Sequence, residues 1–401
     1  MLRWAIAASE VADAAVADAL VRLLEPDDAE HVQRYRNAED RRLALLSRLM
    51  QRAAGGAALG LGATRNLRRR AAAGRGRPFL CRATASRSLA SADDAAKEAL
   101  DAAPNWNYSA SHEGGWVALC AEPLTLCGCD VASPRQRRRP GRRQGFLASV
   151  ALLRDCFADA EWAAVERSLK QRRPNDDGDG GGGDGGDGDG DDDQAEVLAE
   201  AAFSRLWAVK EAFVKARGDG LAFAPLSRVE AVWEGGEGDQ QPPAFADAAA
   251  IAGAARRGSC LAVGTLSIDG GPPQWGRWAV AVHPLPAAEG DEKDAEPSLS
   301  PRTPGVGPAP PPPPPPPARY RRRCWLAVVR GPPSETAPRE LHPEFVDSLA
   351  RRFLDGEELR RAVGGPWAPV RGLKVEDLLM DDDERAAVAA ARAGAGASAS
   401  G

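Results

Sequence analysis

The stretch Trp207-Ala-Val-Lys210-Glu211-Ala-Phe-Val-Lys215-Ala-Arg-Gly218-Asp-Gly220-Leu221 closes the strongest helical pattern of the chain, which runs from about Glu196 to Arg217. Apolar residues recur at helical spacing and predict one buried side, formed by Ala202, Leu206, Val209 and Phe213. Gly218 follows at the position where helices commonly end on a left-handed residue. The stretch therefore predicts a long helix with one buried side and a defined end.

The polar side of this helix carries a charged pair. At about 100° per residue, Glu211 and Lys215 lie together one turn apart, whereas Lys210 lies nearer the apolar side. A carboxylate and an ammonium four residues apart are usually a surface ion pair worth a few tenths of a kcal/mol. The pair gains a functional interpretation only from segments upstream.

Three upstream segments carry chemically useful groups. Cys127-Gly128-Cys129-Asp130-Val131 puts a carboxylate at the end of an expected strand, Ser109-Ala-Ser111-His112 lies within the patch from Pro104 to Pro123, and Gly74-Arg75-Gly76-Arg77-Pro78 is a basic turn. Each has an ordinary structural explanation, namely a Gly-x-Asp turn, a core histidine with satisfied hydrogen bonds, and a solvated loop. Their order along the chain is more specific than any one of them.

Taken together, these segments resemble the signatures of the Sfp-type phosphopantetheinyl transferases. The helical stretch resembles W-x-x-K-E-(A/S)-x-x-K-x-x-G-x-G-L, and the other segments resemble the family's aspartate strand, its N-x-S-H region and its basic G-K-P turn. The chain reads most like the eukaryotic aminoadipate-semialdehyde dehydrogenase phosphopantetheinyl transferases, from Arg3-Trp4-Ala5 to about His283. The resemblance implies an α+β fold of two similar halves, each a small, mainly antiparallel sheet with a long helix, and coenzyme A in the cleft between them.

The resemblance also implies an activity, the Mg²⁺-dependent transfer of 4'-phosphopantetheine from coenzyme A to a serine of an apo carrier protein. Asp130 and Glu211 match the metal ligands, and carboxylates suit Mg²⁺. Glu211 would also accept the serine proton, and Lys215 would stabilise the charge of the departing adenosine 3',5'-bisphosphate. The implied coenzyme-binding residues are Arg75, Arg77, Ser109, Ser111, His112, Lys210 and Lys215. For Lys210 a purely structural role in packing is an equal alternative.

Three positions depart from the family pattern. Ser109 stands where the family has an asparagine, and His31 stands where eukaryotic relatives have a basic residue. Ala132 stands where many bacterial members carry a second acid. The sequence therefore indicates only Asp130 and Glu211 as protein ligands of the metal, and it does not predict a phosphate contact at position 31.

Composition divides the chain into segments. We expect a first half over residues 1–123, a catalytic half over 124–286 with an Asp/Gly insertion at 175–193, a Pro-rich linker at 287–318 and an extension at 319–401. Without the nine Asp of the insertion the formal charge changes from −5 to +4, which suits anionic ligands. We expect Trp116–Ala121 and Leu124–Val131 to form a β-hairpin. We expect the residues from Ala387 onward to be disordered. The extension should add nothing to the core unless Cys324–Val329 joins the edge of a sheet.

Other classes of protein are less favoured. Seven Cys without a CxxC pair indicate a reducing compartment, and no apolar stretch reaches the length of a membrane helix. We therefore expect a cytosolic monomer that binds neither membrane nor nucleic acid, since the Arg135–Arg143 cluster lacks interleaved aromatic residues. The rival hypothesis is a catalytically degenerate scaffold that binds carrier proteins. The sequence does not distinguish fatty-acid, polyketide and aminoadipate-type carriers of lysine biosynthesis.

Overall fold

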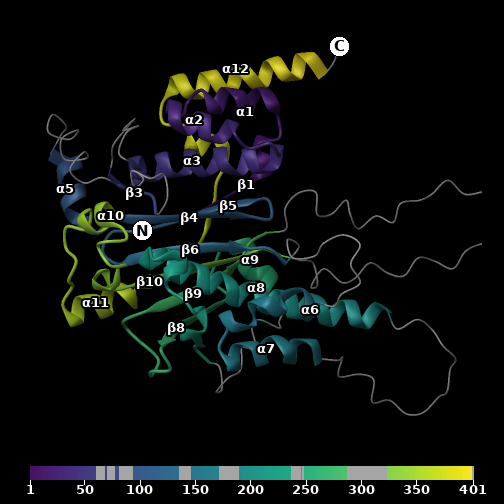
Figure 1. Ribbon diagram of the computed structural model, residues 1–401. Coiled ribbons are helices and arrows are strands. Elements are labelled where there is room, and N and C mark those ends of the chain that lie inside the picture. The colour runs from purple at the N-terminus through teal and green to yellow at the C-terminus, as the bar shows by residue number, and fades with distance from the viewer. Residues whose placement is uncertain are drawn as a thin grey trace, which may run out of the picture.

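The computed structural model describes residues 1–59, 68–69, 77–80, 94–134, 146–170, 189–235, 245, 248–286 and 323–399. Two β-sheets pack face to face in the middle of the molecule, and helices cover the outer face of each sheet (Figure 1). Both sheets are mainly antiparallel and each has one long helix, which confirms the α+β architecture expected from the sequence.

The first sheet has the strand order β11-β1-β5-β4. Its strands are β1 (Leu2–Ala7), β4 (Asn107–Glu113), β5 (Trp116–Glu122) and β11 (Arg371–Gly372). Gly114 and Gly115, with φ of 57° and 77°, make the two-residue turn of the β4–β5 hairpin, a conformation that glycine adopts without strain. The covering helices are α1 (Ala14–Val21), α2 (Pro26–Gln33), α3 (Ala38–Leu59) and α12 (Asp382–Ala399).

The second sheet has the strand order β6-β10-β9-β8-β7 and is antiparallel throughout. Its strands are β6 (Leu126–Ala132), β7 (Val229–Trp233), β8 (Ala262–Ile268), β9 (Ala279–Pro284) and β10 (Trp325–Gly331). Its helices are α6 (Phe146–Val150), α7 (Asp159–Lys170), α8 (Asp189–Arg217) and α9 (Ala248–Arg257). The remaining short elements are β2 (Arg68–Arg69), β3 (Phe79–Leu80), α5 (Asp94–Ala102), α10 (Pro343–Asp347) and α11 (Gly356–Val363).

Helix α8 is the predicted long helix, and it begins earlier than expected, at Asp189. Its apolar side is buried as the periodicity requires, at Ala202, Leu206, Val209 and Phe213. Gly218 has a φ of 91° and its amide donates to the Val214 carbonyl at 2.8 Å, so the predicted helix end is confirmed.

Gly128 of β6 allows α8 to lie directly on the sheet. A Cβ at this position would overlap the carbonyl oxygen of Ala212 and the amide nitrogen of Ala216, both on α8. The backbone of the helix therefore touches the strand, and side chains on the neighbouring positions of β6 and α8 are brought unusually close together.

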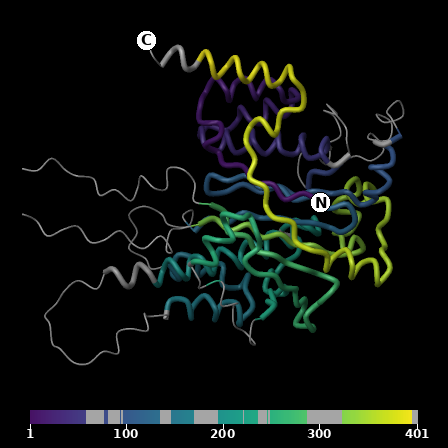
Figure 2. The backbone as a smooth tube through the Cα atoms, turned by 180° about the vertical axis from the view of Figure 1, so that it is seen from behind, coloured from purple at the N-terminus to yellow at the C-terminus, as the bar shows by residue number. Residues whose placement is uncertain are grey.

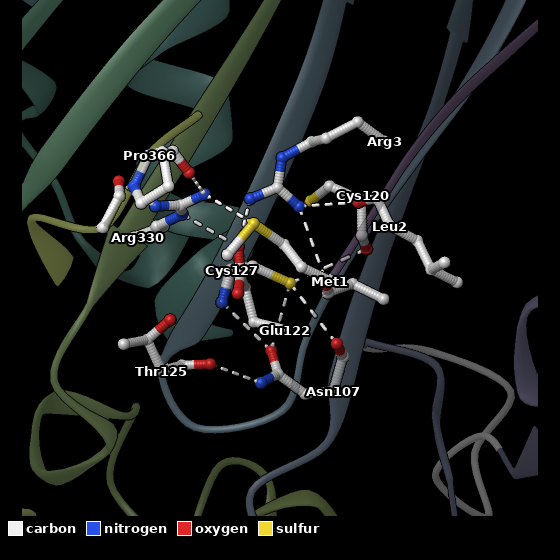
Figure 3. A network of polar contacts seen from close by, with 12 residues as sticks. Met1, Leu2, Arg3, Asn107, Cys120, Glu122, Thr125, Cys127, Arg330 and Pro366 are labelled. Carbon is white, nitrogen blue, oxygen red and sulfur yellow. Dashed lines mark hydrogen bonds and ion pairs between the residues drawn. The ribbon is translucent and has the colours of Figure 1, made fainter. Parts of the chain in front are cut away.

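The inner faces of the two sheets meet in a small core and a buried ionic network. The core contains Ala5, Ala118, Cys129 and Val328 among others. In the network, Glu122 of β5 pairs with Arg3 of β1 and with Arg330 of β10, whose Nε lies 2.8 Å from Glu122 Oε1 (Figure 3). One carboxylate thus links three strands and both sheets.

The predicted hairpin between Trp116–Ala121 and Leu124–Val131 is wrong. Both segments are strands, but β5 belongs to the first sheet and β6 to the second, so the chain crosses between the sheets at this point. β5 pairs with β4 and β1, and β6 pairs with β10. Alternation of side chains predicted the strands but carries no information about the partner of each.

The expectation that the catalytic unit stops near Pro286 is also wrong. β10 lies between β6 and β9 inside the second sheet, and β11 pairs in parallel with β1. Figure 2 shows the last segment running up the back of the molecule from the lower sheet to α12, which packs on α1. The residues from Ala387 onward, expected to be disordered, continue α12 as far as Ala399.

Several segments singled out in the sequence lie outside the described residues. They are Arg75, the Arg135–Arg143 cluster, residues 175–188 of the Asp/Gly insertion and the linker up to residue 318. Within the part of the chain that the structure describes, no helix is both long and apolar enough to cross a membrane.

Candidate active site

Three side chains from three elements meet beside the C-terminal end of α8. Lys215 Nζ lies 2.5 Å from Asp130 Oδ1, Ser111 Oγ donates to the same oxygen at 2.8 Å, and Lys215 Nζ donates to Ser111 Oγ at 3.1 Å. Asp130 and Ser111 are buried, whereas the Lys215 side chain is 32% exposed. The cluster joins β4 of the first half to β6 and α8 of the second.

Alternation along β4 directs Ser111 toward β6. Asn107, Ser109, Ser111 and Glu113 alternate along the strand, and each contacts β6 or the residue that follows it. The contacts advance in step along both strands, for example Asn107 Oδ1 with the Cys127 amide at 3.0 Å and Glu113 Oε1 with the Ser133 amide at 2.7 Å. The position of Ser111 is therefore fixed by a row of contacts on either side of it.

The charge of Lys215 is stabilised by two carboxylates. Burial alone would lower its pKa, but Asp130 and, to a smaller extent, Glu211 act in the opposite direction, so the pKa of Lys215 is raised. Glu211 lies one helical turn before Lys215 and is half-buried. Lys215 is therefore a fixed cation at neutral pH, suited to hold an anionic group.

Asp130 and Glu211 fit the requirements of a magnesium ion. Mg²⁺ is commonly held by one or two carboxylates, with phosphate oxygens and water completing its shell. Asp130 is ion-paired with Lys215, and Glu211 lies on α8 one turn before Lys215, so both carboxylates are neighbours of the same lysine. Among the described residues no group of three or more His, Cys, Asp or Glu could hold a metal, and Ala132 is a buried apolar residue of β6. The donor set thus suits a metal that binds together with a phosphate ligand.

His112 lies on β4 beside Ser111, and only part of its side chain is open to solvent. Partial burial and, next, the charge of Lys215 lower its pKa, while Asp40 of α3 acts in the opposite direction. The imidazole is therefore mostly neutral at pH 7 and can still donate one hydrogen bond to an anion.

The two other departures from the family pattern are structurally distinct. Ser109 is buried in β4, and its carbonyl accepts from the Cys129 thiol at 3.2 Å. His31 is half-buried in α2, with its ring edge-on to Tyr35 at 5.6 Å between centroids. The coenzyme-binding role of Ser109 stays a prediction.

The structure corrects the coenzyme-binding role predicted for Lys210. This side chain is 1% exposed, its ammonium lies 2.5 Å from Glu161 Oε2 of α7, and it donates to the Leu226 carbonyl at 3.2 Å and to the Val229 carbonyl. Glu161 in turn accepts from the Ala231 amide at 3.1 Å. Lys210 therefore links α7, α8 and β7. The sequence allowed two roles for this residue, coenzyme binding and packing, and its contacts are those of a packing role.

The structure also corrects the predicted contact of Arg77 with the adenosine end of coenzyme A. Arg77 is 8% exposed, and both of its terminal nitrogens donate to protein acceptors on α8, β4 and β6. The guanidinium of Arg77 points into the protein, so this residue of the basic turn links α8, β4 and β6.

Sequence reasoning missed Asn107. Its amide Nδ2 donates to the Thr125 carbonyl at 2.7 Å (Figure 3). Its Oδ1 accepts from the Cys127 amide and from Arg77. The alternating polar residues Asn107, Ser109, Ser111 and Glu113 were the available signal, since polar residues at every second position of a strand mark one face.

Comparison with known proteins places this arrangement in a family. The model of the 4'-phosphopantetheinyl transferase N-terminal region matches residues 13–124, and the model of the 4'-phosphopantetheinyl transferase superfamily matches residues 126–238. Together the two matches cover more than half of the chain.

Curated relatives carry the same family name. The L-aminoadipate-semialdehyde dehydrogenase-phosphopantetheinyl transferase of Homo sapiens is 28% identical over 211 residues, which are 52% of this chain and 53% of the relative. The protein of the same name from Xenopus laevis is 25% identical over 209 residues, 52% of this chain and 54% of the relative. The chain spans about half the length of the curated relatives it matches. Asp130, Glu211 and Lys215 all lie within the second matched region, and the chain belongs to the 4'-phosphopantetheinyl transferase superfamily.

Proposed function

We propose that this protein transfers 4'-phosphopantetheine from coenzyme A to a serine of an apo carrier protein and releases adenosine 3',5'-bisphosphate. The observation that carries the proposal is the meeting of Ser111, Asp130 and Lys215, with Glu211 one helical turn before Lys215 on α8. Two carboxylates and a fixed cation from β6 and α8 of the second half, with Ser111 from β4 of the first half beside them, suit a diphosphate and its metal ion. Family membership supports the same reaction.

Asp130 and Glu211 are the residues that would hold Mg²⁺. When bound, the ion would neutralise part of the negative charge of the diphosphate, as metal ions do in other phosphoryl transfers. Ser111 orients Asp130 through its hydrogen bond, and β4 holds Ser111 in place. The protein therefore contributes few ligands, and the phosphate of the substrate completes the site.

The chemical step needs a base and a cation. The hydroxyl of the acceptor serine attacks the phosphorus next to the pantetheine, and Glu211 accepts its proton. A new serine oxygen–phosphorus bond forms, and the bond to the bridging diphosphate oxygen breaks with its electron pair going to adenosine 3',5'-bisphosphate. The ammonium of Lys215, whose pKa is raised, stabilises the charge that develops on the phosphate oxygens.

Intact-protein mass spectrometry tests the proposal directly. Incubation of the full chain with coenzyme A, Mg²⁺ and an apo carrier protein should add the mass of one phosphopantetheine group to the carrier. A chelator of divalent metals should abolish the gain, and a carrier whose acceptor serine is replaced by alanine should show none. Since the curated relatives are named after L-aminoadipate-semialdehyde dehydrogenase, a carrier domain of that type belongs in the first panel beside fatty-acid and polyketide carriers.

The same experiment addresses the rival hypothesis of a degenerate scaffold. A scaffold would bind apo carrier proteins without changing their mass at any magnesium concentration. The intact set of Asp130, Glu211 and Lys215 favours catalysis, since a protein that only bound carriers would have no need to keep a buried carboxylate paired with a lysine.

A further inference from the structure

Helix α8 ends with every one of its last four carbonyl groups hydrogen-bonded. Such groups have no partner within a helix and must find one elsewhere. The Gly218 amide donates to Val214 and the Ala337 amide donates to Arg217 at 2.9 Å. The two carbonyls between them, those of Lys215 and Ala216, accept from Arg77 Nη1 at 2.7 and 2.5 Å. A guanidinium at this end also complements the negative end of the helix dipole.

The other terminal nitrogen of Arg77 connects the same helix end to both strands of the site. Nη2 donates to the Tyr108 carbonyl of β4 at 3.0 Å, to the Cys127 carbonyl of β6 at 2.7 Å and to Asn107 Oδ1. Tyr108 lies three residues before Ser111 on β4, and Cys127 lies three residues before Asp130 on β6. One guanidinium therefore contacts the three elements that carry Ser111, Asp130 and Lys215.

The plane of this guanidinium is fixed by an aromatic ring from the C-terminal segment. The Arg77 Cζ atom lies 4.5 Å from the centroid of Phe345 on α10, and Phe345 is 1% exposed. The ring also packs near Phe79, at 6.5 Å between centroids. Because a guanidinium stacked on a ring presents its donors in one plane, Phe345 limits the directions in which Arg77 can donate.

We propose that Arg77, supported by Phe345, is a positioning residue of the active site: it holds the end of α8 against β4 and β6 so that Lys215 stays in register with Asp130 and Ser111. Lys215 lies in the last turn of the helix, where a terminus frays when its carbonyls lose their donors. A small displacement of the ammonium would break the contacts of 2.5 Å to Asp130 and 3.1 Å to Ser111. This inference deepens the proposed transfer reaction and rests on it.

The variant Arg77→Lys tests the inference, because lysine keeps the charge but lacks the planar fork that reaches two elements at once. We expect kcat for transfer to fall roughly 10- to 100-fold, the effect of misplacing a catalytic group by about 1 Å, while KM for coenzyme A stays unchanged. Phe345→Leu, which keeps the hydrogen bonds and removes the ring, should lower kcat in the same direction by less. It also serves as the deciding variant if Arg77→Lys does not fold.

A matched control is available in Arg52, another largely buried arginine with several partners. It donates to Glu384, to the Leu23 carbonyl at 3.0 Å and to the Leu378 carbonyl at 3.4 Å, on the far side of the first sheet from the site. Arg52→Lys should lower the melting temperature and leave kcat and KM of the folded protein unchanged.

Hydrogen exchange gives a readout that does not depend on activity. Peptides that cover residues 211–218 should exchange faster in Arg77→Lys and Phe345→Leu than in the wild type and in Arg52→Lys. A rise in KM with kcat preserved would mean that Arg77 binds coenzyme A, and a lower melting temperature with kcat and local exchange preserved would mean that it only stabilises the fold. Either result overturns the inference. If the wild type transfers nothing, the proposed function fails, and the exchange experiment still decides whether Arg77 orders the end of α8.

Discussion

Lys215 Nζ and Asp130 Oδ1 lie 2.5 Å apart, so the expected phosphate-binding cation and the expected metal ligand are ion-paired with each other. Asp130→Asn keeps the shape of the side chain and removes its charge. Even residues that only orient metal ligands cost about 10- to 100-fold in metal affinity when changed, so we expect at least that increase in the magnesium concentration for half-maximal transfer. A magnesium titration of the transfer rate measures the shift, and high magnesium should partly restore activity.

Ser111→Ala is the matched control for this prediction. It removes one hydrogen bond to Asp130, worth about 1 kcal/mol, and leaves the carboxylate in place. The magnesium requirement should therefore change less than in Asp130→Asn. Equal shifts in the two variants would show that Asp130 orients other groups and does not bind the metal.

Glu211→Gln separates the proposed base from a surface partner of Lys215. The substitution keeps the size of the side chain and one oxygen, and removes the group that would accept the serine proton. We expect turnover to fall at least roughly 10²-fold, the lower range for a positioned base, with an unchanged melting temperature. Single-turnover transfer at saturating coenzyme A and magnesium is the measurement. Turnover close to that of the wild type would assign Glu211 to the helix surface.

Ending the chain after Glu296 should prevent formation of the second sheet. The truncation removes β10, which forms ladders with β6 on one side and β9 on the other, and also β11 at the edge of the first sheet. Two strand edges and their apolar faces would be exposed, so we expect aggregated protein without transferase activity. Sedimentation after expression and circular dichroism of the soluble fraction report the outcome.

A second truncation, after Met380, removes only α12 and serves as the comparison. This shortened chain keeps both sheets and loses the packing of α12 on α1 and the pair of Arg52 with Glu384. It should remain soluble with a lower melting temperature. If the chain ending at Glu296 folds as well as this one, β10 is dispensable and the strand order described above does not govern stability.

His283 should make the fold sensitive to mild acid. Burial, then the charge of Arg3, lowers its pKa to about 4, below the value of 6.5 in an unfolded chain. Since the unfolded state takes up the proton first, stability is lost as the pH falls from about 6.5 to about 4, by at most about 3 kcal/mol. Chemical denaturation at several pH values should show a flatter profile for His283→Gln. Parallel profiles would assign the acid sensitivity to other groups.

Gly128→Ala tests the contact between β6 and α8. The added methyl group would overlap Ala212 and Ala216 of the helix backbone, which cannot move without shifting α8. Overpacking typically costs about 1–3 kcal/mol, and we expect a loss of this size together with a fall in kcat, since Lys215 moves with the helix. Thermal unfolding and transfer assays on the folded protein measure both effects. Destabilisation without a change in kcat would separate the helix position from catalysis.

The long helix could be predicted because its evidence is local. A period of 3.6 residues fixes which side of α8 is buried, and the string from Trp207 to Leu221 is long enough to identify a family. Asp130 could be predicted for the same reason, because it lies in a short strand two residues after Gly128. These predictions needed no knowledge of which segments meet in space.

Most of the errors concern contacts between distant segments. The sequence suggests for Arg77 either a coenzyme contact or a solvated turn, because nothing near it in the sequence shows that its acceptors belong to residues 108, 127, 215 and 216. In the same way β5 and β6 read as a hairpin because the pattern of a strand does not name its partner. The proline-rich segment before β10 indicated a boundary, although the strand beyond it pairs with β6, almost two hundred residues earlier.

The place of β10 inside the second sheet constrains the order in which the protein can fold during translation. β6 and β9 leave the ribosome before β10, the strand between them, has been made. The interval is longer still for β1, whose partner β11 is made after β10. Their edges stay open while the intervening chain is synthesised, a period in which unpaired strands are prone to aggregate. Asp130 of β6, the proposed metal ligand, is thus made early, whereas the sheet around its strand is among the last parts to be completed.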